Sequence, residues 1–197
     1  MANGFISASE LVDQNIFAVY PAYHGEAYAK EFIHAIENSL KNITYVHYKN
    51  DKLQGNTNTV YLGGQGNISI QGTTFAYAEE KDEGGMGWLN YLIESDGFTF
   101  YYSGFLLAPL EINKKHLVNM AKGGRTCDAA FLLLSARGEN TDYIDQVITI
   151  LKPKEVFLHM ALNTPDEEMI ATLQKKFPAV KFRWARDPGE RFHYKTN

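Results

Sequence analysis

The hydrophobic pattern divides the chain into three parts, of which the first is short. Apolar, β-branched and aromatic residues form runs over residues 16–20 and 43–48, and between them apolar side chains recur on one helical face over 25–40. A run of that length predicts a buried strand, and the 3–4 spacing predicts an amphipathic helix. The first part therefore predicts a strand, a helix and a second strand.

From residue 57 to residue 102 the apolar runs are shorter. Strands are predicted over residues 60–62, 68–70, 73–78, 88–93 and 98–102. Glycine-containing segments at 65–67, 71–72 and 95–97 favour the left-handed or turn backbone that hairpins require. The middle part therefore predicts antiparallel pairing.

After residue 104 helices and strands alternate. Strands are predicted over residues 129–134, 156–159 and 180–184, and a helix over about 112–122 is closed by two glycines. Strands separated by helices pair in parallel through right-handed crossovers. Two further helices carry apolar stripes, formed by Ile144, Val147, Ile148 and Leu151 in one and by Met169, Ile170, Leu173 and Phe177 in the other. Pro153 ends the first of these, and a capping box at 164–167 begins the second.

Composition indicates one soluble α/β domain over residues 1–197. The chain is 45% hydrophobic and carries a net charge of −4, with no cluster of basic residues longer than a pair, which disfavours nucleic acid as a partner. It has no run of about 18 apolar residues and no basic leader, so membrane insertion and secretion are disfavoured. Cys127 is the only cysteine, which excludes an intrachain disulfide and a cysteine-based zinc site and favours the cytoplasm.

His159 is the first candidate for chemistry. It stands at the predicted carboxyl end of a buried parallel strand, and sites in α/β proteins gather at such ends. There it could bind a ligand or transfer a proton. The alternative is a histidine that packs at the strand end and hydrogen-bonds to the backbone.

Two segments resemble the metallo-β-lactamase superfamily. Residues 152–160, a Pro-Lys turn followed by an apolar strand ending in His159, are similar to the segment that delivers the last histidine ligand of that family. Residues 91–104, with their Asp-Gly turn and Tyr-x-Ser-Gly end, are similar to the two strands that precede the family's bridging aspartate. In this chain Phe105 stands where that aspartate should follow, and phenylalanine cannot bind a cation.

The family's His-x-His-x-Asp-His motif corresponds to residues 19–24. Only His24 is retained in this register, whereas Val19 and Pro21 replace histidines and Tyr23 replaces the aspartate that holds the attacking water. The family usually supplies another histidine in a loop that corresponds to residues 79–87. Acidic residues stand there instead, namely Glu79, Glu80 and Asp82.

The resemblance implies an αββα sandwich of the metallo-β-lactamase kind. It extends from about residue 17 to about residue 184 and is strongest over 87–104 and 129–160. Only about fifteen residues precede the motif, so we expect an incomplete N-terminal half, or a part of the parent protein outside this chain. An open sheet would need a cover, which predicts a homo-oligomer.

Two functions from different classes follow from the resemblance. The first is a non-catalytic protein that keeps the fold to bind a small molecule or to self-associate, with no metal cofactor, since a catalytic zinc needs roughly three protein ligands. The second is a hydrolase that uses zinc or another divalent metal, with His24 and His159 as ligands and an acidic residue as base. Tyr23, Glu79, Asp82 and Phe105 would line the site, although the acidic residues could equally form a solvated surface.

Other motifs give weaker predictions. A strand, turn and helix over 17–36 could begin a flavodoxin-like nucleotide domain, but Pro21 and the lack of a Ser/Thr-rich loop disfavour phosphate binding. The glycines at 63–66 and 84–87 lie among hairpins and indicate turns. No Gly-x-Ser-x-Gly sequence occurs, which disfavours a serine hydrolase.

Overall fold

The computed structural model describes residues 17–19, 44–48, 59–81, 87–103, 109–134, 141–160 and 167–184. Within these ranges the smaller of two sheets consists of three parallel strands. They are β1 (Phe17–Val19), β2 (Thr44–Tyr48) and β3 (Thr59–Leu62), in that spatial order. In the central strand the side chains of Thr44, Tyr45, Val46 and Tyr48 are buried.

The larger sheet has seven strands in the described ranges, in the order β10-β9-β8-β7-β6-β5-β4. Pairing is antiparallel from β4 to β7 and parallel from β7 to β10. The strands are β4 (Gln65–Ile70), β5 (Thr73–Lys81), β6 (Gly87–Ser95), β7 (Phe98–Tyr102), β8 (Ala129–Leu134), β9 (Glu155–Met160) and β10 (Lys181–Trp184).

Two tight hairpin turns set the antiparallel register. Gln71 and Gly72 join β4 to β5 with φ values of 49° and 85°, and Asp96 and Gly97 join β6 to β7 with 51° and 75°. Two successive residues with positive φ make a type I′ turn, whose twist matches that of the flanking strands. Residues 71–72 and 95–97 therefore act as the sequence predicts.

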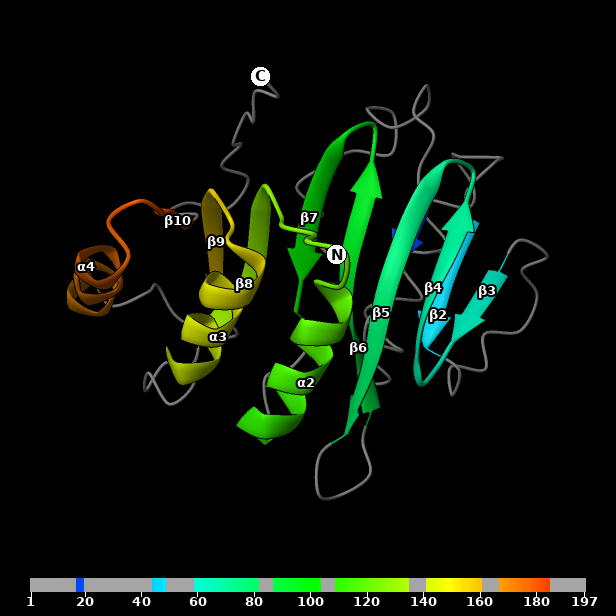
Figure 1. Cartoon of the computed structure of the whole chain (residues 1–197), viewed down its shortest axis with the longest axis horizontal. Helices are drawn as coiled ribbons and strands as arrows, with labels where there is room; N and C mark the ends of the chain where they lie inside the picture. The colour runs from blue at the N-terminus through cyan, green and yellow to red at the C-terminus, as the bar shows by residue number, and fades with distance from the viewer. Residues whose placement is uncertain are drawn as a thin grey trace, which may run out of the picture.

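Three described helices cover one face of the larger sheet. They are α2 (Leu110–Met120), α3 (Thr141–Leu151) and α4 (Glu167–Lys176), and Figure 1 shows α2 and α3 in front of the sheet. None of them has the length and apolar character that crossing a membrane requires. Their buried side chains join those of the sheet in one apolar core, which includes Leu92, Leu117, Leu132, Ile144, Val147, Leu151, Val156, Leu158 and Leu173.

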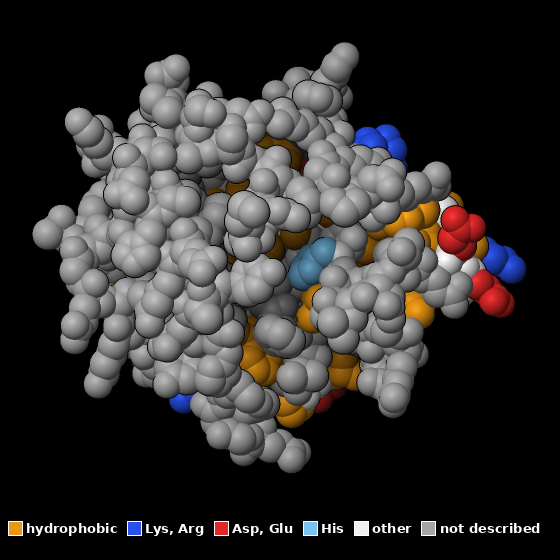
Figure 2. Space-filling model, turned by 180° about the vertical axis from the view of Figure 1, so that it is seen from behind, with side chains coloured by type: hydrophobic (Ala, Val, Ile, Leu, Met, Phe, Trp, Pro, Cys, Tyr) orange, Lys and Arg blue, Asp and Glu red, His pale blue; other side chains and the backbone are white. Residues whose placement is uncertain are grey.

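The opposite face of the larger sheet packs against the smaller sheet. Side chains from β2 and β3 meet those from β5 and β6 in a second core, formed by Val46, Tyr48, Leu62, Phe75, Leu89, Tyr91 and Ile93. Figure 2 views the molecule from this side, where apolar side chains appear between atoms that are not described. The layers are therefore helices, large sheet and small sheet.

The sequence predicts most of the described strands correctly, with three corrections. Residues 65–67, predicted as a turn, belong to β4, and residues 79–81, predicted as a loop, belong to β5. β3, predicted among antiparallel strands, pairs in parallel with β2. The predicted helix over 25–40 and most of the capping box at 164–167 lie outside the described residues.

Candidate functional site

His159 lies near the carboxyl end of β9, as predicted. β7, β8 and β9 are parallel neighbours, so their carboxyl ends meet at one edge of the sheet. The His159 and Tyr102 rings are stacked there, with centroids 6.2 Å apart and planes 10° from parallel. The residue is exposed, yet partial desolvation lowers the pKa of its imidazole below the ordinary 6.5. A neutral imidazole is the form that binds a metal or accepts a hydrogen bond.

Aromatic side chains continue the same sheet face below this pair. Phe131 and Phe157 stack with centroids 4.9 Å apart, and Phe100 meets the Phe131 ring edge-on at 6.0 Å. All three are only partly buried. Because side chains alternate between the faces of a strand, these rings share the face of Tyr102 and His159. The Tyr102 and His159 rings and these three phenylalanines therefore form one aromatic surface on this face of the sheet.

Ser103 fixes the carboxyl end of β7. Its backbone N–H donates to the Phe131 carbonyl at 3.1 Å, its hydroxyl contacts the same carbonyl at 3.3 Å, and its Oγ accepts from the Leu133 N–H at 3.4 Å. It is fully buried. The chain therefore leaves β7 from a position held against β8.

Glu79 is committed to structural contacts. Its Oε1 accepts from the Tyr48 hydroxyl at 2.6 Å, and its Oε2 accepts from the Gly64 N–H at 2.5 Å. Lys81 lies 3.2 Å from Oε1. The carboxylate thus connects β2 of the small sheet to β5 of the large one, and both oxygens have protein partners.

Glu79 and His159 lie on one sheet face at a similar level, but far apart. Glu79 pairs with Leu89 on β6, and His159 pairs with Leu133 on β8. Since β6, β7 and β8 intervene, the separation is roughly 19 Å at about 4.8 Å per strand. Ligands of one zinc ion lie about 2 Å from it, so this arrangement does not bring Glu79 and His159 onto the same ion.

The other residues of the predicted site lie outside the described ranges. They are Tyr23, His24, Asp82 and Phe105. The motif at 19–24 begins at the carboxyl end of β1, where Val19 is the last described residue. Across the described ranges, no three side chains of His, Cys, Asp or Glu are grouped closely enough to hold a metal ion.

Comparisons place this arrangement among known folds. No protein-family model and no curated protein matches the chain. The metallo-β-lactamase fold protein YhfI from Bacillus subtilis is 12% identical and superposes with a TM-score of 0.64, over 93% of this chain and 78% of its own. The chain has a metallo-β-lactamase-like fold. A protein of the metallo-β-lactamase superfamily from Thermotoga maritima is 14% identical and superposes with a TM-score of 0.43, over 66% of this chain and 67% of its own.

The metallo-β-lactamase-like domain also contains a buried polar cluster that the sequence did not reveal. Glu80 on β5 is 1% exposed, its Oε2 accepts from the Trp88 indole N–H at 3.2 Å, and its Oε1 lies 3.6 Å from His116 Nδ1 on α2. Glu80 is therefore not part of a solvated surface. The signal was the alternation of β5, which continues past Ala78 and directs Glu80 toward the helices.

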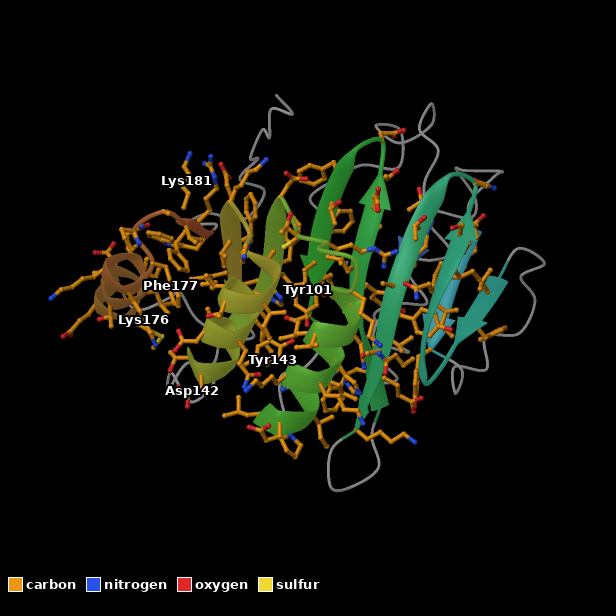
Figure 3. The ribbon with its side chains drawn as sticks, viewed as in Figure 1. Tyr101, Asp142, Tyr143, Lys176, Phe177 and Lys181 are labelled. Atoms are coloured by element: carbon orange, nitrogen blue, oxygen red, sulfur yellow. The ribbon has the colours of Figure 1, made fainter. Side chains whose placement is uncertain are left out.

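Two tyrosines lie in the same layer. Tyr101 on β7 and Tyr143 on α3 point toward each other in Figure 3, and their hydroxyls form a buried hydrogen bond. Burial is the main cause that raises the pKa of both phenols well above 10, and the charge of Glu80 adds to it in each case. Both phenols therefore stay protonated, and one hydroxyl donates its hydrogen to the oxygen of the other.

The thiol of Cys127 is predicted to be unreactive in the native domain. Burial, then the charge of Asp128, raise its pKa from 9.0 to about 12, although a hydrogen bond from the Tyr101 backbone opposes the shift. Because the thiolate is the nucleophile, native protein at pH 8 should react with a thiol reagent far more slowly than denatured protein. Absorbance of the released chromophore measures this. Equal rates in the two states would contradict it.

Proposed function

We propose that this chain is a metallo-β-lactamase-fold protein that has lost the catalytic metal site and acts as a non-catalytic binding protein. The observation that carries the proposal is the set of residues at the family's ligand positions. Val19 and Pro21 replace histidines, and Tyr23 and Phe105 replace aspartates. A catalytic zinc needs roughly three protein ligands and a water position, and these side chains supply none of them.

The geometry of the described donors supports this proposal. Glu79, which could have replaced a missing ligand, has Tyr48 and Gly64 as hydrogen-bond partners on its two oxygens. It also lies across three strands from His159. His159 is thus the one predicted ligand among the described residues that stands at the expected edge.

We place the bound molecule at the carboxyl ends of β7, β8 and β9. The stacked Tyr102 and His159 rings offer a flat, partly polar surface, and the Phe131 and Phe157 pair adds an apolar one. Small-molecule sites are mostly apolar with a few placed polar groups. We therefore expect the bound small molecule to have a planar apolar part, which would stack on these rings.

The alternative is a metal-dependent hydrolase with an altered ligand set. His159 favours this alternative, because it is exposed at the strand end where the family's last ligand stands. Desolvation also lowers the pKa of its imidazole, which favours the neutral form that binds a metal. His24 and Asp82 would complete the set. A bound divalent metal would polarise the scissile group and activate water.

Metal analysis distinguishes the two functions. We expect purified protein to contain no stoichiometric zinc, manganese or iron, and its melting temperature to be unchanged by added zinc. A ligand at one hundred times its Kd would stabilise the native state by about 2.7 kcal/mol, which raises the melting temperature by roughly 5 to 10 °C.

His159→Ala is the matched variant. In the binding-protein proposal, wild type and His159→Ala respond alike to zinc. One equivalent of metal in the wild type that disappears in His159→Ala would overturn the proposal and support the hydrolase. Elemental analysis and thermal melting give both readouts.

A further inference from the structure

The two edges of the large sheet differ in charge. At one end, β10 carries Lys181 and Arg183, and both basic groups contact Glu155 on β9, at 3.8 Å and 2.5 Å respectively. At the other end lies β4, and Figure 1 shows the two strands at opposite ends of the sheet. Charged edge strands resist pairing with other chains, so β10 is a protected edge.

β4 lacks such charged residues. No charged residue occurs between Lys52 and Glu79, although 21% of the whole chain is charged. β4 itself contains no proline, and its register with β5 is continuous from Gln65 to Ile70, without a bulge. Within the described ranges it pairs with β5 alone. A six-residue, uncharged and regular edge is a template for another strand.

The phase of the hairpin determines which backbone groups point outward. Ile70 and Thr73 flank the two-residue turn, so they form a hydrogen-bonded pair, and every second residue of β4 then bonds to β5. The Glu79 N–H donates to the Gly64 carbonyl at 2.7 Å, which agrees with this phase. The remaining residues direct their N–H and C=O groups away from β5. They are Gln65, Asn67 and Ser69.

Side chains on the helix-facing side of β4 form hydrogen bonds within the chain. Asn119 on α2 donates to the Gln65 side chain at 3.3 Å, and Arg125 donates to the Asn67 side chain at 3.2 Å. Ser69 and Thr74 share a hydroxyl hydrogen bond of 3.1 Å across the hairpin. Because the side chains are fixed, pairing at the outer edge would order little that is not already ordered.

We propose that β4 is the interface between two copies of this chain, which pair it antiparallel about a two-fold axis. An axis at Asn67 sets that residue opposite its own copy and sets Gln65 opposite Ser69. Every outward N–H then meets a carbonyl of the other copy. A strand pairs with itself most easily when it is uncharged, because two-fold pairing places like groups together. The two large sheets become one continuous sheet.

A proline at position 69 tests the interface. Ser69→Pro removes an outward N–H and leaves the backbone hydrogen bonds to β5 intact, and edge strands tolerate such a proline. It also removes the hydroxyl bond to Thr74, a loss that Ser69→Ala shares. By symmetry two hydrogen bonds are lost, so dimer affinity should fall about tenfold or more. Ser69→Ala, which keeps the N–H, should dimerise as the wild type does. Sedimentation velocity over a range of concentrations, with circular dichroism as the folding check, measures this.

A charge exchange at the axis keeps the test decisive if the proline variant does not fold. Asn67→Lys should be monomeric alone, because its ammonium and the Arg125 guanidinium of both copies would face each other, and it should form a heterodimer when mixed with Asn67→Glu. A monomeric wild type at every concentration would overturn the proposal. So would a dimer that neither Ser69→Pro nor the charge variants weaken. None of these outcomes depends on metal, so they leave the proposed function to its own test.

Discussion

His116→Ala is expected to lower the free energy of unfolding by about 3 kcal/mol, because it removes one partner of a buried charged group. Glu80 is 1% exposed, and its Oε1 lies 3.6 Å from His116 Nδ1. These two atoms lie within ion-pair distance but form no hydrogen bond, so the loss comes from the electrostatic contact, while Trp88 still binds the other oxygen. Urea unfolding followed by tryptophan fluorescence measures the change.

A double variant separates the cost of an isolated carboxylate from a loss of packing. Glu80→Met together with His116→Ala should recover part of the lost stability, because replacing both members of a buried pair by apolar groups leaves no buried charge. The recovery is incomplete because the Trp88 indole N–H loses its Glu80 acceptor. A double variant as unstable as His116→Ala would assign the effect to packing of α2. A His116→Ala loss below about 1 kcal/mol would show that the pair contributes little.

The sequence predicts the carboxyl-edge location of His159 because helix and strand patterns alternate from residue 104 onward. Alternation implies parallel strands, and parallel strands bring their carboxyl ends to one edge. The strand bounds at 98–102 and 129–134 also agree with β7 and β8. Local periodicity is sufficient for these elements, since each is bounded by turns or by helices with clear apolar stripes.

The two acidic residues of β5 were not predictable in the same way. Adjacent glutamates usually indicate solvent, but Glu79 and Glu80 face opposite sides of the strand, and each contacts a side chain that is distant in the sequence. Tyr48 lies 31 positions from Glu79, and His116 lies 36 positions from Glu80. Such partners become neighbours only through sheet order and helix packing. The hydrophobic pattern of the sequence gives no information on sheet order or on helix packing.

The parallel pairing of β3 with β2 has a related cause. Turn-forming residues surround 60–62, and short strands among turns are typical of hairpins. In the structure, Tyr45 to Tyr48 pair with Thr59 to Leu62, so β3 belongs to the small sheet. Leu62 of β3 is buried and packs into the core between the sheets. Tertiary packing therefore overrides the local signal.

Gly87→Ala is expected to destabilise the contact between the two sheets by about 2 to 4 kcal/mol, through overpacking and a lost hydrogen bond. A Cβ at Gly87 would overlap the Tyr48 hydroxyl and lie 2.6 Å from its Cζ. Tyr48 is fully buried, and its hydroxyl donates to Glu79 at 2.6 Å. The ring cannot retreat without breaking that bond, so strain and a lost partner add together.

Gly66→Ala is the matched control, because a Cβ there would also meet a tyrosine hydroxyl, at 2.7 Å from Tyr77. Tyr77 is only partly buried, so its ring can move, and we expect a loss below about 1 kcal/mol. Combining Gly87→Ala with Tyr48→Phe removes the overlapping oxygen and should restore part of the stability. Equal urea midpoints for Gly87→Ala and Gly66→Ala would mean that the sheets separate easily. The Glu79 carboxylate would then contribute little to holding the small sheet in place.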